Sequence, residues 1–147
     1  MTPPLHASAV AFDGKGVLIR GPAGSGKSCL CASLIDAQGA QLVADDRVHL
    51  DKTGDGVHLR AHENLAGLLE IRGVGLLRLP YLASAPLALV VDLAATPQAV
   101  PRLPQAAYFE HAPVLTFCGH DPMTALKIKL ACRALKDGFR DDAIYLL

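Results

Sequence analysis

One run of residues limits the folds open to this chain more than any other: Gly21-Pro22-Ala23-Gly24-Ser25-Gly26-Lys27-Ser28. It has the spacing GxxxxGK followed by Ser or Thr, in which glycines let the backbone wrap closely around phosphate oxygens. A strand pattern at Val17 to Arg20 precedes the run, and a helical apolar spacing at Ser28 to Ala37 follows it. Strand, loop and helix in this order predict an α/β domain with a phosphate-binding P-loop.

The last two residues of the run have separate predicted roles. Lys27 supplies an ammonium for the β and γ phosphate oxygens, and the Ser28 hydroxyl can take one position on Mg²⁺. We therefore expect ATP and Mg²⁺ as cofactors. The residues expected to bind the nucleotide are Gly21, Pro22, Ala23, Gly24, Ser25, Gly26, Lys27 and Ser28. The alternative is a glycine-rich turn that matches by chance, which the flanking strand and helix patterns disfavour.

A second apolar strand pattern, Leu42 to Ala44, leads directly into Asp45 and Asp46. A P-loop protein needs a carboxylate at such a strand end to hold Mg²⁺ or its waters. Adjacent strand residues point to opposite faces, so both acids reach one site only if the chain bends there. One acid would then orient the metal and the other would accept a proton from an acceptor hydroxyl. The alternative is a solvated turn after a strand.

Length and charge exclude several classes of protein. The 147 residues suit a single domain, predicted over residues 1–147. Fourteen basic residues balance fourteen acidic ones, so no global field attracts nucleic acid or an anionic membrane. Residues 1–11 lack the features of a signal peptide, and no apolar run approaches the ~20 residues of a membrane span. We expect a cytoplasmic protein that binds neither nucleic acid nor membrane, with its four cysteines as reduced core thiols.

The rest of the chain gives weaker structural signals. Strand patterns fall at residues 7–12, at 47–50 and 57–61 as a hairpin, and at 87–93 as a strand buried on both faces. A short helical turn is expected at 64–70, and irregular chain at 94–113 with pairing open at 106–109. A final helix is predicted from Asp121 as N-cap to Gly138, with Leu126, Leu130 and Leu135 on one side.

Three motifs in order resemble the C-terminal catalytic domain of the HPr serine kinase/phosphorylase family. They are the P-loop, the run Leu42 to Asp46, and Leu69-Glu70-Ile71-Arg72-Gly73-Val74-Gly75, of which the LEIRGxG stretch is the most specific. The resemblance spans Leu5 to Gly138, and the chain looks like a short form without the family's N-terminal domain. It implies an α/β P-loop kinase domain similar to phosphoenolpyruvate carboxykinase, with a strand-rich mixed sheet around the phosphate-binding helix.

The resemblance also implies roles for individual residues. Asp46 matches the general base for an acceptor serine, and Asp45 supports that base or the metal. Glu70 matches a Mg²⁺ ligand beside Ser28, so the implied metal ligands are Ser28, Glu70 and Asp45. Catalytic roles are implied for Asp46, Asp45, His6, Lys27, Arg72 and Arg102. Without the resemblance, Glu70 and Arg72 could equally well form a surface ion pair. Arg102 would then be interpreted as an exposed loop residue between prolines.

The implied activity is an ATP- and Mg²⁺-dependent protein serine kinase that phosphorylates the phosphocarrier protein HPr in regulation of the phosphotransferase system. Family likeness also implies a homo-oligomer, a hexamer, and the apolar stretch Leu76 to Leu89 is a candidate for a subunit or partner contact. Two competing hypotheses are a P-loop kinase with another acceptor and a catalytically reduced nucleotide sensor.

Two departures from the family pattern bear on that activity. Pro22 and Ala23 stand where relatives commonly have Asp and Ser, and proline removes a backbone donor. Residues 113–119 lack the arginines of the segment associated with phosphorolysis of phosphoserine. The resemblance therefore supports kinase activity more strongly than phosphorylase activity.

Overall fold

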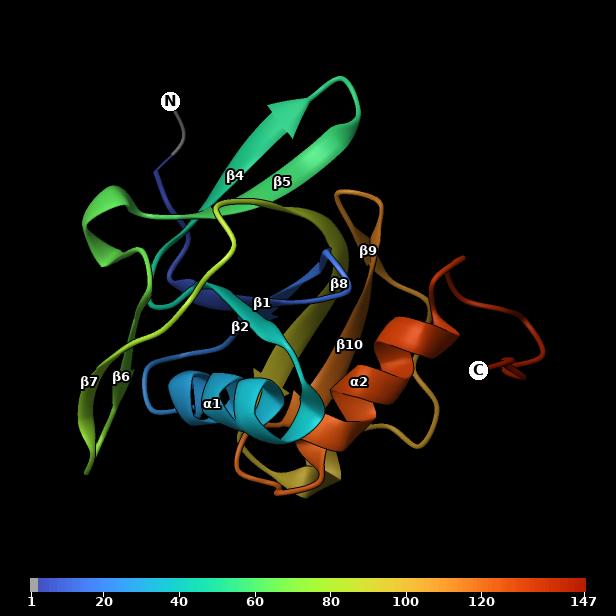
Figure 1. Ribbon diagram of the computed structural model, residues 1–147. Helices are drawn as coiled ribbons and strands as arrows, with labels where there is room; N and C mark the ends of the chain where they lie inside the picture. The colour runs from blue at the N-terminus through green and yellow to red at the C-terminus, as the bar shows by residue number, and fades with distance from the viewer. Residues whose placement is uncertain (1–2) are drawn as a thin grey trace.

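The computed structural model describes residues 3–147, and its centre is a mixed β-sheet with two α-helices packed on one face (Figure 1). Strands β1 (Ala7–Phe12) and β2 (Lys15–Arg20) contain the two predicted strand segments and pair as an antiparallel hairpin. Helix α1 (Lys27–Gln38) follows, and strand β3 (Gln41–Ala44) returns antiparallel to β1. Gly39 ends α1 in the left-handed conformation at φ 80°, a common C-terminal cap for a helix.

The longest strand, β8 (Ala85–Ala94), runs through the middle of the sheet. It pairs in parallel with β2 on one side and with β10 (Ala112–Cys118) on the other, giving the order β3-β1-β2-β8-β10-β9. Leu89 and Val91 belong to the core on the helix side, whereas Val90 belongs to the core on the opposite face. The strand is therefore buried on both faces, as its apolar sequence predicts.

Two further hairpins extend from this sheet. Strands β4 (Val48–Thr53) and β5 (Gly56–Ala61) form the first, and β5 also pairs with the start of β8. Strands β6 (Leu68–Ile71) and β7 (Gly75–Arg78) form a separate two-stranded sheet beside α1 (Figure 1). The helical turn expected at 64–70 is therefore confined to the 3₁₀ turn Glu63–Leu65, because residues 68–71 pair with β7.

The C-terminal part departs furthest from the sequence predictions. Strand β10 gave no clear pattern in the sequence, yet it pairs with β8 and also carries the short β9 (Tyr108–Phe109). A 3₁₀ turn at Pro97–Ala99 lies within the otherwise irregular segment before them. None of the helices in residues 3–147 is long and apolar enough to cross a membrane.

The final helix, α2 (Thr124–Ala134), starts later and turns a different side inward than predicted. Met123 is its N-cap, while Asp121 accepts a hydrogen bond from the Met123 amide at 2.8 Å in the preceding turn. Ile128 is fully buried, whereas Leu126 and Leu130 are each 37% exposed. The small residues Ala125 and Ala131 let this face approach the sheet and α1, which leaves Leu126 and Leu130 at the edge. Leu135, just after the helix, is 7% exposed and belongs to the core.

Candidate functional site

The P-loop, residues 21–28, connects the end of β2 to the start of α1. Gly24 and Gly26 have φ values of 80° and 94°, a conformation that side chains with a Cβ rarely adopt. Gly26 is also the N-cap of α1, so the N-terminal end of the helix dipole points into the loop. The predicted strand–loop–helix arrangement is therefore present, with glycines where the backbone path requires them.

The Lys27 side chain lies within the curve of this loop and is only 8% exposed. Its ammonium donates to the carbonyl oxygens of Gly21 at 2.6 Å and Pro22 at 3.1 Å. The Ser25 hydroxyl is buried in the same loop and has no hydrogen-bond partner among the described residues. The ammonium and the unpaired hydroxyl lie in a loop whose glycines Gly24 and Gly26 have positive φ. Both groups are donors that can bind phosphate oxygens.

Asp45 connects the P-loop to the first strand. Its carboxylate accepts hydrogen bonds from the Ser28 hydroxyl, at 3.0 Å to each oxygen, and from the Ser8 hydroxyl at 2.7 Å. Asp45 is 6% exposed and Ser8 fully buried, so these bonds satisfy polar groups that would otherwise be costly to bury. The contact arises because β1 and β3 are antiparallel neighbours, so the start of β1 lies beside the end of β3, close to the start of α1.

Asp46 is directed differently from its neighbour because the chain bends after β3. Its φ of 69° places it in the left-handed region, and the Arg47 amide donates to the Asp45 carbonyl at 2.8 Å. The Asp46 carboxylate lies 3.0 Å from Nε2 of His6, and both side chains remain more than half exposed. The bend that two adjacent acids would need to reach one site is thus present.

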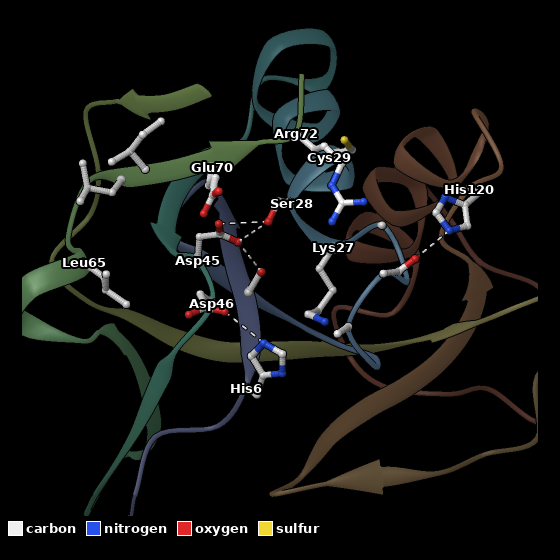
Figure 2. A pocket seen from close by; sticks show the side chains of 16 residues that line it. His6, Lys27, Ser28, Cys29, Asp45, Asp46, Leu65, Glu70, Arg72 and His120 are labelled. Atoms are coloured by element: carbon white, nitrogen blue, oxygen red, sulfur yellow. Dashed lines mark hydrogen bonds and ion pairs between the residues drawn. The ribbon is translucent and has the colours of Figure 1, made fainter. Parts of the chain in front are cut away.

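These groups share one cavity of about 650 Å³ with Glu70 and Arg72 (Figure 2). The β6–β7 hairpin brings Glu70 close to Asp45 and Ser28, and Arg72 to a position beside Cys29. Of the residues with predicted catalytic or metal-binding roles, the structure therefore brings together His6, Lys27, Ser28, Asp45, Asp46, Glu70 and Arg72.

Arg102 is the exception among the predicted catalytic residues. It is exposed and lines a different cavity of about 430 Å³, which is formed with Phe117, Lys127 and Tyr145. Its segment follows β8 and turns away toward α2 instead of returning to the P-loop. The prediction that Arg102 joins the P-loop site is therefore not met within this chain.

Two contacts on the P-loop were not predicted from the sequence. His120, in the loop between β10 and α2, also lines the cavity, and its Nε2 lies 3.1 Å from the Gly24 carbonyl oxygen (Figure 2). Next to it, Gly119 packs so closely on Ser25 that an added Cβ would overlap the Ser25 carbonyl oxygen. The sequence signal was a Gly-His pair just before a predicted helix, which has no P-loop spacing to identify it.

One of the four cysteines lies in the cavity and the others lie behind or away from it. All four are free thiols. Burial, reinforced by the negative Asp45 carboxylate, raises the pKa of the Cys31 thiol, so it stays protonated behind the P-loop. Burial likewise raises the pKa of Cys132 to about 12. The expectation of reduced thiols holds, although Cys29 is exposed and lines the cavity instead of the core.

Within residues 3–147, no group of three or more His, Cys, Asp or Glu side chains is arranged to hold a metal ion. Mg²⁺ differs from Zn²⁺ in this respect, because it usually combines one or two protein oxygens with waters and substrate phosphates. The Ser28 hydroxyl and the Asp45 carboxylate lie beside the P-loop, with Glu70 on the same side of the cavity, and fit that pattern.

The fold and this site define a P-loop α/β protein with adjacent carboxylates at the end of the strand after the P-loop helix. The chain belongs to the HPr Serine kinase C-terminal domain family, whose sequence model matches residues 2–84, more than half of its length. The solved HPr(Ser) kinase/phosphatase from Coxiella burnetii is similar with a TM-score of 0.74 at 26% identity, over 90% of this chain and 89% of that one. The predicted fold class is confirmed.

Curated relatives match over a shorter region. The HPr kinase/phosphorylase of Bordetella pertussis is 46% identical over 78 residues, which cover 52% of this chain and 25% of that protein. The HPr kinase/phosphorylase of Exiguobacterium sibiricum is 42% identical over 77 residues, again 52% of this chain and 24% of the relative. The matched region thus spans about a quarter of these proteins. The domain model ends at residue 84, and the structural match, which covers 90% of this chain, extends the resemblance beyond it.

Proposed function

We propose that this chain transfers the γ-phosphoryl group of Mg²⁺-ATP to a serine of an HPr-like phosphocarrier protein. The observation that carries the proposal is the position of Asp46, an exposed carboxylate in the same cavity as the Lys27 ammonium. One group there can bind phosphate while the other receives a proton from an acceptor hydroxyl. Family membership supplies the choice of HPr as acceptor.

In the proposed reaction, the serine oxygen forms a bond to the γ phosphorus as the bond between that phosphorus and its bridging oxygen breaks. Asp46 takes the serine proton, and ADP leaves with the electron pair of the broken bond. The P-loop amides and Lys27 bind the phosphates, with Lys27 exchanging a carbonyl contact for a phosphate oxygen. His6, which contacts Asp46 at 3.0 Å, positions the base.

The remaining residues compensate the negative charge of the phosphates. Ser28, Asp45 and Glu70 would hold Mg²⁺, which when bound neutralises charge on the β and γ oxygens. Arg72 lines the same cavity beside Cys29 and would stabilise negative charge that develops on the transferred group. Arg102 is left out of this mechanism because it lines another cavity.

The test is transfer from γ-labelled ATP, with Mg²⁺, to purified HPr and to HPr with its acceptor serine replaced by alanine. Label on the serine form alone supports the proposal. ATP binding without label on either form would support a nucleotide sensor or a kinase with another acceptor.

Asp46→Asn tests the role of the base. The substitution should leave ATP affinity nearly unchanged and lower transfer by about 100-fold or more, because general-base catalysis typically contributes that much. Transfer at the wild-type rate by Asp46→Asn would remove Asp46 from the mechanism.

A further inference from the structure

The β6–β7 hairpin has one buried and one open face. Leu69 is 1% exposed and Ile71 packs against the same core, which includes α1. Glu70 and Leu76 are cross-strand partners on the other face, and both line the cavity. The hairpin is therefore held to the core by one face and turns the other toward the site.

The open face carries exposed apolar side chains. Leu76 is 63% exposed although it lines the cavity, and Val74 at the turn of the hairpin is 71% exposed. Exposed apolar groups gathered beside a site commonly mark a surface that another molecule covers. Of the stretch Leu76 to Leu89 that was expected to make a subunit or partner contact, residues 85–89 are instead used in strand β8, which leaves the part on β7 available.

The apolar side of the cavity is the side of Asp46. Leu65 and Leu68 line the cavity together with Leu76. Figure 2 shows Leu65 near Asp46, across the cavity from Lys27 and His120. Phosphates held by the P-loop would therefore leave this apolar half open to the acceptor.

We propose that the β6–β7 hairpin is the docking surface for the protein acceptor. The acceptor hydroxyl would be surrounded by apolar side chains of the acceptor that pack on the hairpin. This inference rests on the function proposed above and adds how the acceptor is recognised. For transfer, the acceptor hydroxyl must come within roughly 3–3.5 Å of the γ phosphorus. The acceptor surface around that hydroxyl must therefore lie over the side of the cavity that contains Asp46. Leu76 lines the same cavity as Asp46.

The extent of the apolar surface favours a protein over a small acceptor. A small molecule fits inside a cavity of about 650 Å³ and leaves Val74, at the hairpin turn, in contact with water. A protein surface would cover Val74 and Leu76 together and bury both side chains. A second copy of this chain seated on the same residues would instead obstruct access on the Asp46 side.

The experiment compares the double variant Val74→Ser/Leu76→Ser with a matched control, Leu103→Ser/Ile144→Ser, in the full chain. The control residues are similarly exposed, at 60% and 68%, and neither lines the site cavity. Steady-state transfer to HPr at saturating ATP gives KM and kcat, a nucleotide titration gives the ATP Kd, and sedimentation gives the assembly mass. For Val74→Ser/Leu76→Ser we expect KM for HPr to rise about tenfold or more, as for loss of an interface hot spot.

The same variant should keep its ATP Kd within about twofold, because phosphate binding uses the other half of the cavity. The control should keep the wild-type KM. An unchanged KM in the hairpin variant, or a loss of activity that follows a change in assembly mass, would overturn the docking role. If the wild-type chain transfers nothing to HPr, the proposed function itself fails, and with it the acceptor assigned to the hairpin.

Discussion

The Ser28 hydroxyl lies 3.0 Å from each oxygen of the Asp45 carboxylate, at the point where the starts of α1 and β1 meet the end of β3. The same carboxylate accepts from Ser8, so a single acidic group joins three segments of the chain. Asp45→Asn replaces one acceptor oxygen with an amide donor and removes the negative charge. Both changes act on the group that is proposed to orient the metal.

We expect Asp45→Asn to lower the affinity for ATP in the presence of Mg²⁺ by about 10- to 100-fold, the usual effect of losing a metal-orienting partner. The affinity without Mg²⁺ should change much less. Calorimetric titration with and without the metal measures the difference, with Asp36→Asn on the exposed side of α1 as control. Equal losses in both titrations would point to a general disruption of the loop.

Gly119→Ala should disturb the P-loop from a distance in the sequence. The new Cβ would overlap the Ser25 carbonyl oxygen, so the loop or the β10–α2 connection must move. We expect ATP affinity to fall at least about tenfold, a loss of about 1.4 kcal/mol of binding free energy. Gly54→Ala is the matched control, because its Cβ would meet nothing within 4 Å. Wild-type affinity in Gly119→Ala would show that the contact is easily relieved.

Two substitutions on α2 test which side of the helix carries the packing. Ile128→Ala removes a fully buried side chain and should lower the free energy of unfolding by about 2–5 kcal/mol. Leu126→Ala, at 37% exposure, should cost about 1 kcal/mol or less. Denaturant unfolding of the two variants measures the difference. A larger loss of unfolding free energy for Leu126→Ala than for Ile128→Ala would show that the side of α2 with Leu126 and Leu130 carries the packing.

The stability of the β4–β5 hairpin should depend on pH through His49. Its Nε2 lies 2.9 Å from Nδ1 of His62 with the rings stacked, a contact that needs one neutral nitrogen to accept. Burial, then the positive charges of Arg60 and His62, lower the pKa of His49 below its ordinary 6.5, against the opposing effect of Asp51 and Glu63.

As the pH falls, His49 therefore takes up a proton at a higher pH in the unfolded chain than in the folded chain. The contribution of His49 to stability is present above pH 6.5 and is lost as the pH drops toward the lowered pKa. Unfolding free energies of the wild type and His49→Gln, measured at several pH values from above 6.5 downward, should converge at low pH. A constant gap between the two would contradict this linkage.

Local sequence was sufficient for the first third of the chain. The β1–β2 hairpin, the P-loop, α1 and β3 follow from short-range patterns: alternating apolar residues, a fixed glycine spacing and a helix stop at Gly39. The adjacent pair Asp45 and Asp46 at the end of β3 also lies in the cavity beside this loop, and a strand end is a local feature. Here each residue's role depends mainly on neighbours within one or two turns.

Contacts between distant segments decided the rest. Sequence spacing cannot say that Ser8 and Ser28 share Asp45, that His120 reaches Gly24, or that Arg102 lines another cavity. The buried side of α2 was set by how closely Ala125 and Ala131 let it pack, not by where its leucines fall. Thus the sequence by itself determined the phosphate loop and its acids, because their conformations are local. Only the tertiary structure decided which other groups surround them, because pairing and packing bring those residues together across the whole chain.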